Sequence, residues 1–174
     1  MRGYLVVRPI PAAFWWRRPE INDLRIGYCR EVARTVAARH GVARPPVDVE
    51  GIALAEGMRV ARVTTLGALD ARLREDAGGW LIELNADRAL TAQRFSVSHE
   101  IGHLKLNHDS CGTNANQERQ ANVFAAELLI PLQLLKVSLT QRHSLESLAA
   151  LFQVSREAMT IKLTEQNLLL KLMG

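Results

Sequence analysis

The stretch RFSVSHEIGHL, residues 94–104, says more about this chain than any other part of its sequence. It contains the pattern HExxH at residues 99–103, in a segment whose apolar spacing predicts a helix. His99 and His103 are one helical turn apart, so both imidazoles can bind a single metal ion. Glu100 lies beside them, where a carboxylate can polarise a metal-bound water and later pass on its proton. The pattern therefore predicts a metal centre on a helix.

The residues around the pattern strengthen this interpretation. HExxH also occurs by chance in ordinary helices, where its polar side chains bind nothing. Here apolar side chains between Phe95 and Leu106 predict that the rest of the helix is buried. A polar triplet has no packing reason to lie among them, so the context favours a functional site.

A catalytic zinc site needs a third protein ligand, and the residues just after the pattern supply only weak candidates. Asp109 lies six residues beyond His103, where a metzincin-type ligand would stand, but Leu106 replaces the glycine that this turn requires. His108 would point away from the ligand face if the helix continued past it. We therefore expect a capping or surface role for His108.

The next predicted helix, residues 116–130, offers a better third ligand. Glu118 is near its start, and Asn122 lies one turn further on the same face, placed to orient a ligating histidine. Glu127 is the rival carboxylate. It lies nine residues beyond Glu118, which is half a revolution of a helix, so the two cannot face the same metal ion. We expect Glu127 to be an exposed helix carboxylate.

Residues 94–104 and the later stretch ERQANVFAAELLIP, residues 118–131, together resemble the ImmA/IrrE family of metallopeptidases. That family pairs an HExxH helix with a helix of the pattern ExEANxFAAxLLMP, and the resemblance covers roughly residues 47–170. Gln120 and Ile130 depart from the pattern. The resemblance implies a zincin-like, gluzincin-type fold in which Zn2+ is bound by two histidines and one glutamate. The three ligands would be His99, His103 and Glu118, with Glu100 as general base and acid and Asn122 as a supporting residue.

The resemblance also implies a function, namely a regulatory zinc-dependent endopeptidase. Its substrate or partner would be a helix-turn-helix repressor protein, often encoded nearby on a mobile element or in a toxin–antitoxin-like pair. In such folds an extended substrate can add to the edge of the sheet beside the metal. The predicted docking strand consists of Trp80, Leu81, Ile82, Glu83 and Leu84.

The order of the predicted elements is helices, a small sheet and then helices again, which defines an α+β domain. We expect helices over residues 22–40, 49–56, 91–106, 116–130, 144–152 and 155–170, a further helix beginning at residue 131, and strands over 58–63, 68–74 and 80–84. This divides the chain into an N-terminal arm (1–20) that packs its aromatic residues 14–16, a metallopeptidase domain (21–135) and a helical segment resembling a helix-turn-helix (136–174).

Two other functions compete with proteolysis. The helix-turn-helix-like residues 148–159 could belong to a DNA-binding regulator, whose basic contacts would come from Arg156, Lys162 and Lys171. Acidic residues lie among these, so we place structural packing first and expect no direct contact with nucleic acid. The second alternative binds a repressor with little or no turnover. Cys111 could approach the metal as a blocking ligand, although an idle thiol is the simpler interpretation.

The composition sets outer limits on these interpretations. The chain has 174 residues, 48% of them hydrophobic, and a formal net charge of +4, which suits one globular domain and is too small a charge to argue for nucleic acid. Two distant cysteines form no disulfide framework and suit a reducing cytoplasm. We find no apolar run long enough to span a membrane. The sequence therefore predicts a cytoplasmic protein.

Overall fold

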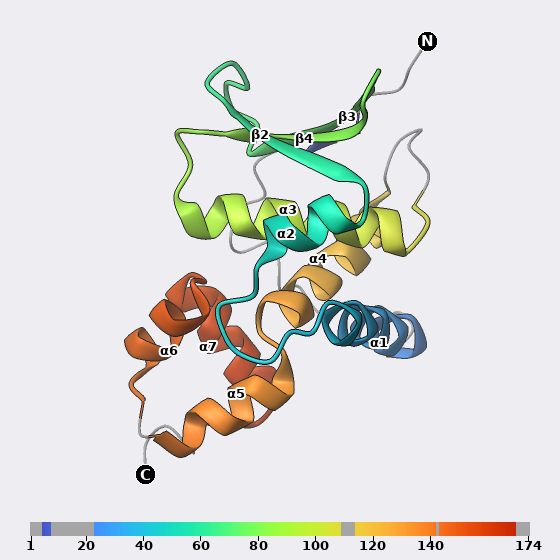
Figure 1. Cartoon of the computed structure of the whole chain (residues 1–174). Helices are drawn as coiled ribbons and strands as arrows, with labels where there is room; N and C mark the ends of the chain where they lie inside the picture. The colour runs from blue at the N-terminus through green and yellow to red at the C-terminus, as the bar shows by residue number, and fades with distance from the viewer. Residues whose placement is uncertain (1–4, 8–22, 109–113, 142, 170–174) are drawn as a thin grey trace.

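A small β-sheet lies on one side of a layer of helices in the computed structural model, which describes residues 5–7, 23–108, 114–141 and 143–169 (Figure 1). The elements are β1 (Leu5–Val7), α1 (Asp23–Arg39), α2 (Val49–Ala55), β2 (Met58–Val63), β3 (Ala71–Asp76), β4 (Gly79–Asn85), α3 (Leu90–Lys105), α4 (Ala115–Leu129), α5 (Leu132–Ser138), the 3₁₀ helix η2 (Leu139–Gln141), α6 (Leu145–Phe152) and α7 (Arg156–Glu165). The predicted α+β class is confirmed.

The four strands are arranged in the order β1-β3-β4-β2. Strands β3 and β4 form an antiparallel hairpin, whose tight turn is closed by Gly79 at a φ of 94°. Strand β2 runs parallel to β4, and β1 pairs antiparallel with β3. The sequence did not predict β1, which falls within the N-terminal arm; the aromatic residues 14–16 of that arm lie outside the described residues.

Both backbone edges of β4 are therefore occupied. Met58 to Val63 pair with one edge, and Ala71 to Asp76 pair with the other. A substrate strand cannot add to a strand whose hydrogen-bonding groups are already used. The prediction that Trp80–Leu84 offers a free docking edge is wrong, because β4 is an internal strand.

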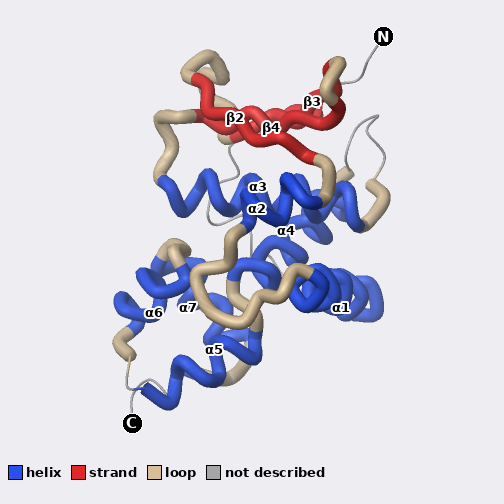
Figure 2. Tube along the Cα trace, in the orientation of Figure 1, coloured by secondary structure: helices blue, strands red, loops and turns tan. Residues whose placement is uncertain are grey.

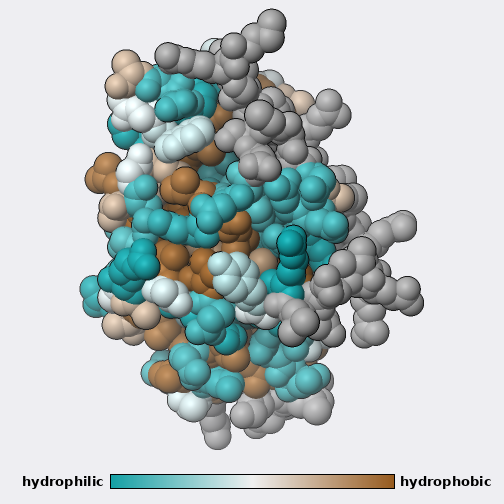
Figure 3. All heavy atoms as spheres, turned by 90° about the vertical axis from the view of Figure 1, so that its right-hand side faces the viewer, coloured by the Kyte–Doolittle hydropathy of each residue, from teal (hydrophilic) through white to brown (hydrophobic). Residues whose placement is uncertain are grey.

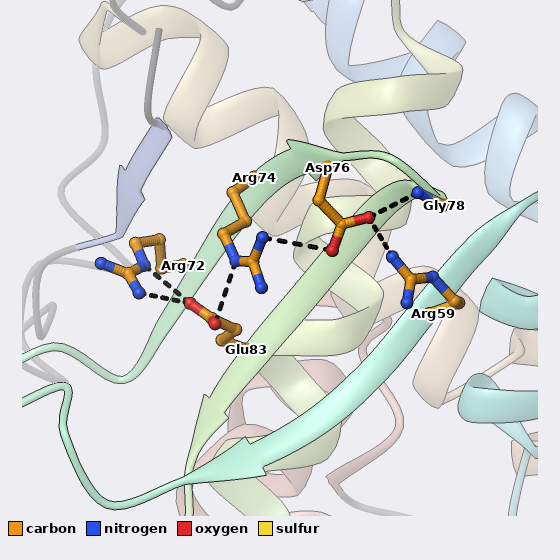
Figure 4. A network of polar contacts seen from close by, with 6 residues as sticks. All are labelled: Arg59, Arg72, Arg74, Asp76, Gly78 and Glu83. Atoms are coloured by element: carbon orange, nitrogen blue, oxygen red, sulfur yellow. Dashed lines mark hydrogen bonds and ion pairs between the residues drawn. The ribbon is translucent and has the colours of Figure 1, made fainter. Parts of the chain in front are cut away.

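The face of the sheet that carries Glu83 holds a network of ion pairs (Figure 4). Glu83 is only 7% exposed and accepts hydrogen bonds from Arg72 Nε at 2.8 Å and Arg74 Nε at 3.0 Å. Burial alone would raise the pKa of Glu83, but the two guanidinium groups outweigh it and hold the pKa below its usual value. Asp76 pairs with Arg59 and accepts a hydrogen bond from the Gly78 amide at 2.8 Å. Glu83, predicted to contact substrate, is committed to arginines of its own sheet.

Helix α3 lies beneath the sheet and crosses α4 on its other side (Figure 2). A Cβ atom on Gly102 would lie 3.0 Å from Phe124 Cδ1 and 3.2 Å from Ala121 Cα, so this crossing requires a residue without a side chain. The close approach brings the first turn of α4 next to the last turns of α3. Asn114 caps α4 in a capping box with Gln117, which fixes where that first turn begins.

The C-terminal helices α6 and α7 pack into the same core as α4. Four of their side chains are fully buried: Leu148, Phe152, Met159 and Leu163. Arg94 on α3 is also buried and donates hydrogen bonds to the carbonyls of Val47 at 2.8 Å and of Gln153, between α6 and α7, at 3.3 Å. These contacts support packing; recognition of DNA by this pair stays a prediction. The last helix ends at Glu165, and residue 170 lies outside the described residues.

Among the described residues, no single helix is both long and apolar enough to cross a membrane. The pair formed by Ala115–Leu129 and Leu132–Gln141, bent by 41°, meets the criteria of length and composition only when the two are joined.

Candidate metal centre

Three of the predicted ligands lie together where the end of α3 meets the start of α4. His99 Nε2 and His103 Nε2 are 2.9 Å apart. The Glu118 carboxylate lies 3.3 Å from the first of these nitrogens and 3.4 Å from the second. One possible ligand atom from each of the three residues lies within 4.8 Å of the other two. Both imidazoles are buried and the Glu118 side chain is 23% exposed, so the group reaches the surface on the carboxylate side.

His99 is oriented by Asn122, which the sequence placed one turn beyond Glu118. Asn122 Oδ1 lies 2.7 Å from His99 Nδ1. A carbonyl oxygen only accepts, so His99 Nδ1 carries a proton and donates it. The other ring nitrogen, Nε2, faces His103 and Glu118 and is the one that a metal ion could bind. The same face of α4 thus supplies one donor atom and orients another, as expected for partners of a metal-ligating histidine.

His103 has a different partner, His108, and the prediction of a capping or surface role for His108 missed this contact. The two Nδ1 atoms are 2.9 Å apart, and His108 Nε2 lies 3.0 Å from Gln120 Oε1. Helix α3 ends at Lys105, close to the predicted end at residue 106, so His108 does not lie on a continuing helix. Asn107 adopts a φ of 52°, in the left-handed region, and turns the chain back toward His103.

The backbone hydrogen bonds identify this turn as a Schellman motif. The His108 amide donates to the His103 carbonyl at 3.0 Å, and the Asn107 amide donates to the Leu104 carbonyl at 3.3 Å. Asparagine is, after glycine, the residue that most readily ends a helix in this way. Asn107 was therefore a signal in the sequence that could have revealed the position of His108.

Glu100 is fully buried beside the two imidazoles. Within the described residues, neither of its carboxylate oxygens has a hydrogen-bond partner. Burial raises the pKa of Glu100 to about 7, reinforced by the negative charge of Glu118 and opposed by His99. A carboxyl group with a pKa near neutrality can take up a proton and give it back, which is what a general base and acid must do.

The protonation state of His103 suits metal binding. Burial lowers the pKa of His103 to about 4, so His103 is neutral at pH 7 and has a lone pair to offer. Burial also acts to lower the pKa of His99, but the Glu118 carboxylate, the charge of Glu100 and the hydrogen bond to Asn122 hold it above its usual value. Two imidazole nitrogens and a carboxylate form a donor set that fits zinc. The arrangement can hold a divalent ion and place a base next to it.

The other candidate residues lie elsewhere. Glu127 is 1% exposed, accepts a hydrogen bond from Arg34 Nε at 2.8 Å and pairs with the buried Lys162. The expectation of an exposed carboxylate is wrong, because α1 and α7 cover that side of α4. Asp109 and Cys111 lie outside the described residues. Sequence reasoning missed the contacts of His108 and Gln120.

The side of the molecule where α3 ends and α4 begins is turned toward the viewer in Figure 3. Apolar surface gathers in the middle of this face, between hydrophilic areas. A surface of this mixed kind suits contact with a polypeptide.

Comparison with known proteins adds a family to this geometry. No curated protein matches the chain. Among solved structures, a Mycobacterium tuberculosis transcriptional regulator has a similar fold, with a TM-score of 0.65 and 16% sequence identity. The match covers 88% of this chain and 50% of that one, so the chain spans about half the length of the regulator. The model of the Peptidase_M78 family, described as an IrrE N-terminal-like domain, matches residues 55–164, which is more than half of the chain. This chain is therefore a member of the Peptidase_M78 family, with an IrrE N-terminal-like domain.

Proposed function

We propose that this protein is a zinc-dependent endopeptidase. The observation that carries the proposal is the convergence of His99 Nε2, His103 Nε2 and the Glu118 carboxylate, beside the buried carboxyl group of Glu100. Membership of a peptidase family agrees with this arrangement. The third ligand comes from a separate helix, α4, which supports the zincin-like, gluzincin-type fold.

Each residue then has a defined task. When bound, zinc acidifies a water molecule and polarises the scissile carbonyl group. His99, His103 and Glu118 hold the ion, and Asn122 fixes the ring of His99. Glu100 takes the proton from the attacking water and delivers it to the leaving amine nitrogen.

The substrate in this proposal is a helix-turn-helix repressor protein, and the site of action is the cytoplasm. Support comes from the family, and from the similar fold of the Mycobacterium tuberculosis transcriptional regulator. Direct DNA binding by α7 is disfavoured by its contacts. Lys162 is buried against Glu127, and Arg156 lies 3.1 Å from Glu146. Two of the three predicted basic contacts are thus neutralised within the chain.

The first experiment measures the metal content of the purified protein by mass spectrometry. The variants are His103→Ala and Glu118→Ala, with Glu157→Ala, at an exposed position of α7, as a matched control. We expect about one zinc per chain in the wild type and in the control, and loss of zinc in the other two. Each protein is then incubated with a purified helix-turn-helix repressor protein, and the products are identified by mass. Only the wild type and the control should cut it.

Three outcomes would contradict parts of the proposal. Zinc retained in Glu118→Ala would mean that the third ligand is another residue. A wild type that takes up no zinc, even when zinc is supplied, would remove the metal centre. A zinc-loaded protein that binds the repressor without cutting it would favour the alternative function, a regulator that acts by binding.

A further inference from the structure

The two histidines of the metal centre are held by partners of different kinds. Asn122 Oδ1 can only accept a hydrogen bond, so His99 Nδ1 donates to it and His99 Nε2 is the nitrogen that faces the metal position. His103 Nδ1 instead faces His108 Nδ1 at 2.9 Å, and an imidazole nitrogen can either donate or accept. One proton must lie between these two nitrogens, and the position of that proton decides whether His103 can bind a metal ion.

Gln120 decides this position. Its Oε1 atom lies 3.0 Å from His108 Nε2 and accepts from it, so His108 carries its proton on Nε2. The Nδ1 atom of a neutral His108 then has a lone pair and accepts the proton of His103 Nδ1. His103 Nε2 is left with its lone pair, directed at His99 and Glu118. The orientation of the Gln120 amide thus determines, through the His108 ring, which nitrogen of His103 carries the proton.

We infer that His108 and Gln120 are positioning residues that together fix the tautomer of His103 in which Nε2 is free to bind the metal. The inference rests on the metal centre of the proposed function and adds two residues to it. If the amide of Gln120 were reversed, its NH2 group would donate to His108 Nε2. Every hydrogen bond in the chain would then reverse, and His103 would point an N–H group at the ligand position. A carboxylate at residue 120 has only acceptor atoms and would enforce the favourable direction.

The test reads the tautomer directly in the metal-free protein, by nitrogen-15 NMR of the His103 ring. The variants are His108→Leu, which removes the partner ring, and Gln120→Met, which removes the acceptor at similar volume. Gln120→Glu is the conservative variant, and Gln133→Met makes the same chemical change at an exposed position of α5. The zinc affinity of each is measured by competition with a coloured chelator, and circular dichroism checks that each is folded.

We expect wild-type His103 to carry its proton on Nδ1. In His108→Leu and Gln120→Met a fraction of the rings should move the proton to Nε2, and zinc affinity should fall about 10- to 100-fold. Gln120→Glu and Gln133→Met should keep both the tautomer and the affinity. A wild-type His103 protonated on Nε2 overturns the inference, and so does an unchanged tautomer in both His108→Leu and Gln120→Met.

These results separate the inference from the proposed function. A wild type that shows the expected tautomer but takes up no zinc would contradict the metal centre and leave the hydrogen-bond chain in place. If the wild type binds zinc and cuts its substrate, but substitutions at residues 108 and 120 leave the tautomer of His103 unchanged, the inference alone would be contradicted.

Discussion

Glu100 on α3 and Glu127 on α4 are two equally buried glutamates, 0% and 1% exposed, in opposite electrostatic surroundings. Glu127 lies between Arg34 and Lys162, and although burial acts to raise its pKa, the two cations outweigh it and hold the pKa below its usual value. Glu100 has no hydrogen-bond partner within the described part of the chain, and burial raises its pKa to about 7.

The difference shows that burial alone does not define the role of a carboxyl group. The cations around Glu127 keep it ionised, so it serves to join α1, α4 and α7. The surroundings of Glu100 leave its proton exchangeable near neutral pH, which is a requirement of acid–base chemistry and a cost to stability. Four changes would break or sharpen this contrast.

The largest effect is expected for Glu100→Gln. The amide cannot take a proton from water, so kcat/KM for any peptide that the wild type cuts should fall at least about 100-fold. The zinc content should not change, because Glu100 is not a ligand. Glu157→Gln, at an exposed site, is the control. Full activity in Glu100→Gln would show that another group is the base.

Lys162→Met tests the other half of the contrast. Removing Lys162 leaves the buried Glu127 with the half-exposed Arg34 as its remaining partner, so the free energy of unfolding should fall by up to about 3 kcal/mol. The double variant Glu127→Met, Lys162→Met should recover most of this loss, since Arg34 is half exposed and can reach water. Urea unfolding measures both. A double variant as unstable as the single one would contradict the assigned pairing.

The third change compares Glu→Gln at the two positions in metal-free protein as a function of pH. Glu100 has a folded pKa of about 7 against an ordinary 4.5, so between these values the folded state holds a proton that the unfolded state has lost. Its contribution to the free energy of unfolding therefore falls as pH rises through this range. Glu100→Gln should be more stable than the wild type by about 3 kcal/mol at pH 8 and should match it near pH 4.

Glu127→Gln should show the opposite sign. The folded pKa of Glu127 is lowered, so its stabilisation is present above the unfolded pKa and is lost as pH falls through the folded value. The variant should be less stable than the wild type at pH 7, and the deficit should shrink in acid. The same sign at both positions, measured by urea unfolding at each pH, would refute the contrast.

The smallest effect is expected for Gly102→Ala, at the crossing of α3 and α4. The new Cβ would press on Phe124 and the backbone of Ala121. Overpacking costs more than the gain in helix propensity, so we expect a net loss of about 1 kcal/mol together with weaker zinc binding. Urea unfolding measures the loss, and a variant as stable as the wild type would show that the crossing tolerates a side chain.

The sequence correctly predicted those parts of the site that depend only on the spacing of residues within one helix. The turn between His99 and His103 and the turn between Glu118 and Asn122 are fixed by helical geometry, and the structure brings these four residues together. The strands and most helix bounds followed from periodicity in the same way.

The errors concern contacts between distant segments. Glu127 looks like a surface residue until α7 supplies Lys162, which lies 35 positions further along the chain. Strand β4 looks like an edge until β2 and β3 are placed on either side of it. The direction of His108 was considered only for a helix that continues, whereas Asn107 turns the chain back toward His103. Strand β1 is only three residues long and has no periodicity to detect.

The two helices of the metal centre leave the ribosome one after the other. A nascent chain that has reached the end of α3 already contains both histidines and Glu100, but not Glu118, Asn122 or Gln120. At that stage the chain has only two donors one turn apart, and neither imidazole has the amide that sets its proton. The three ligand residues and the residues that orient them therefore come together only when α4 has been synthesised and has docked at Gly102, so unfinished or unfolded copies of this protein lack the proposed catalytic site.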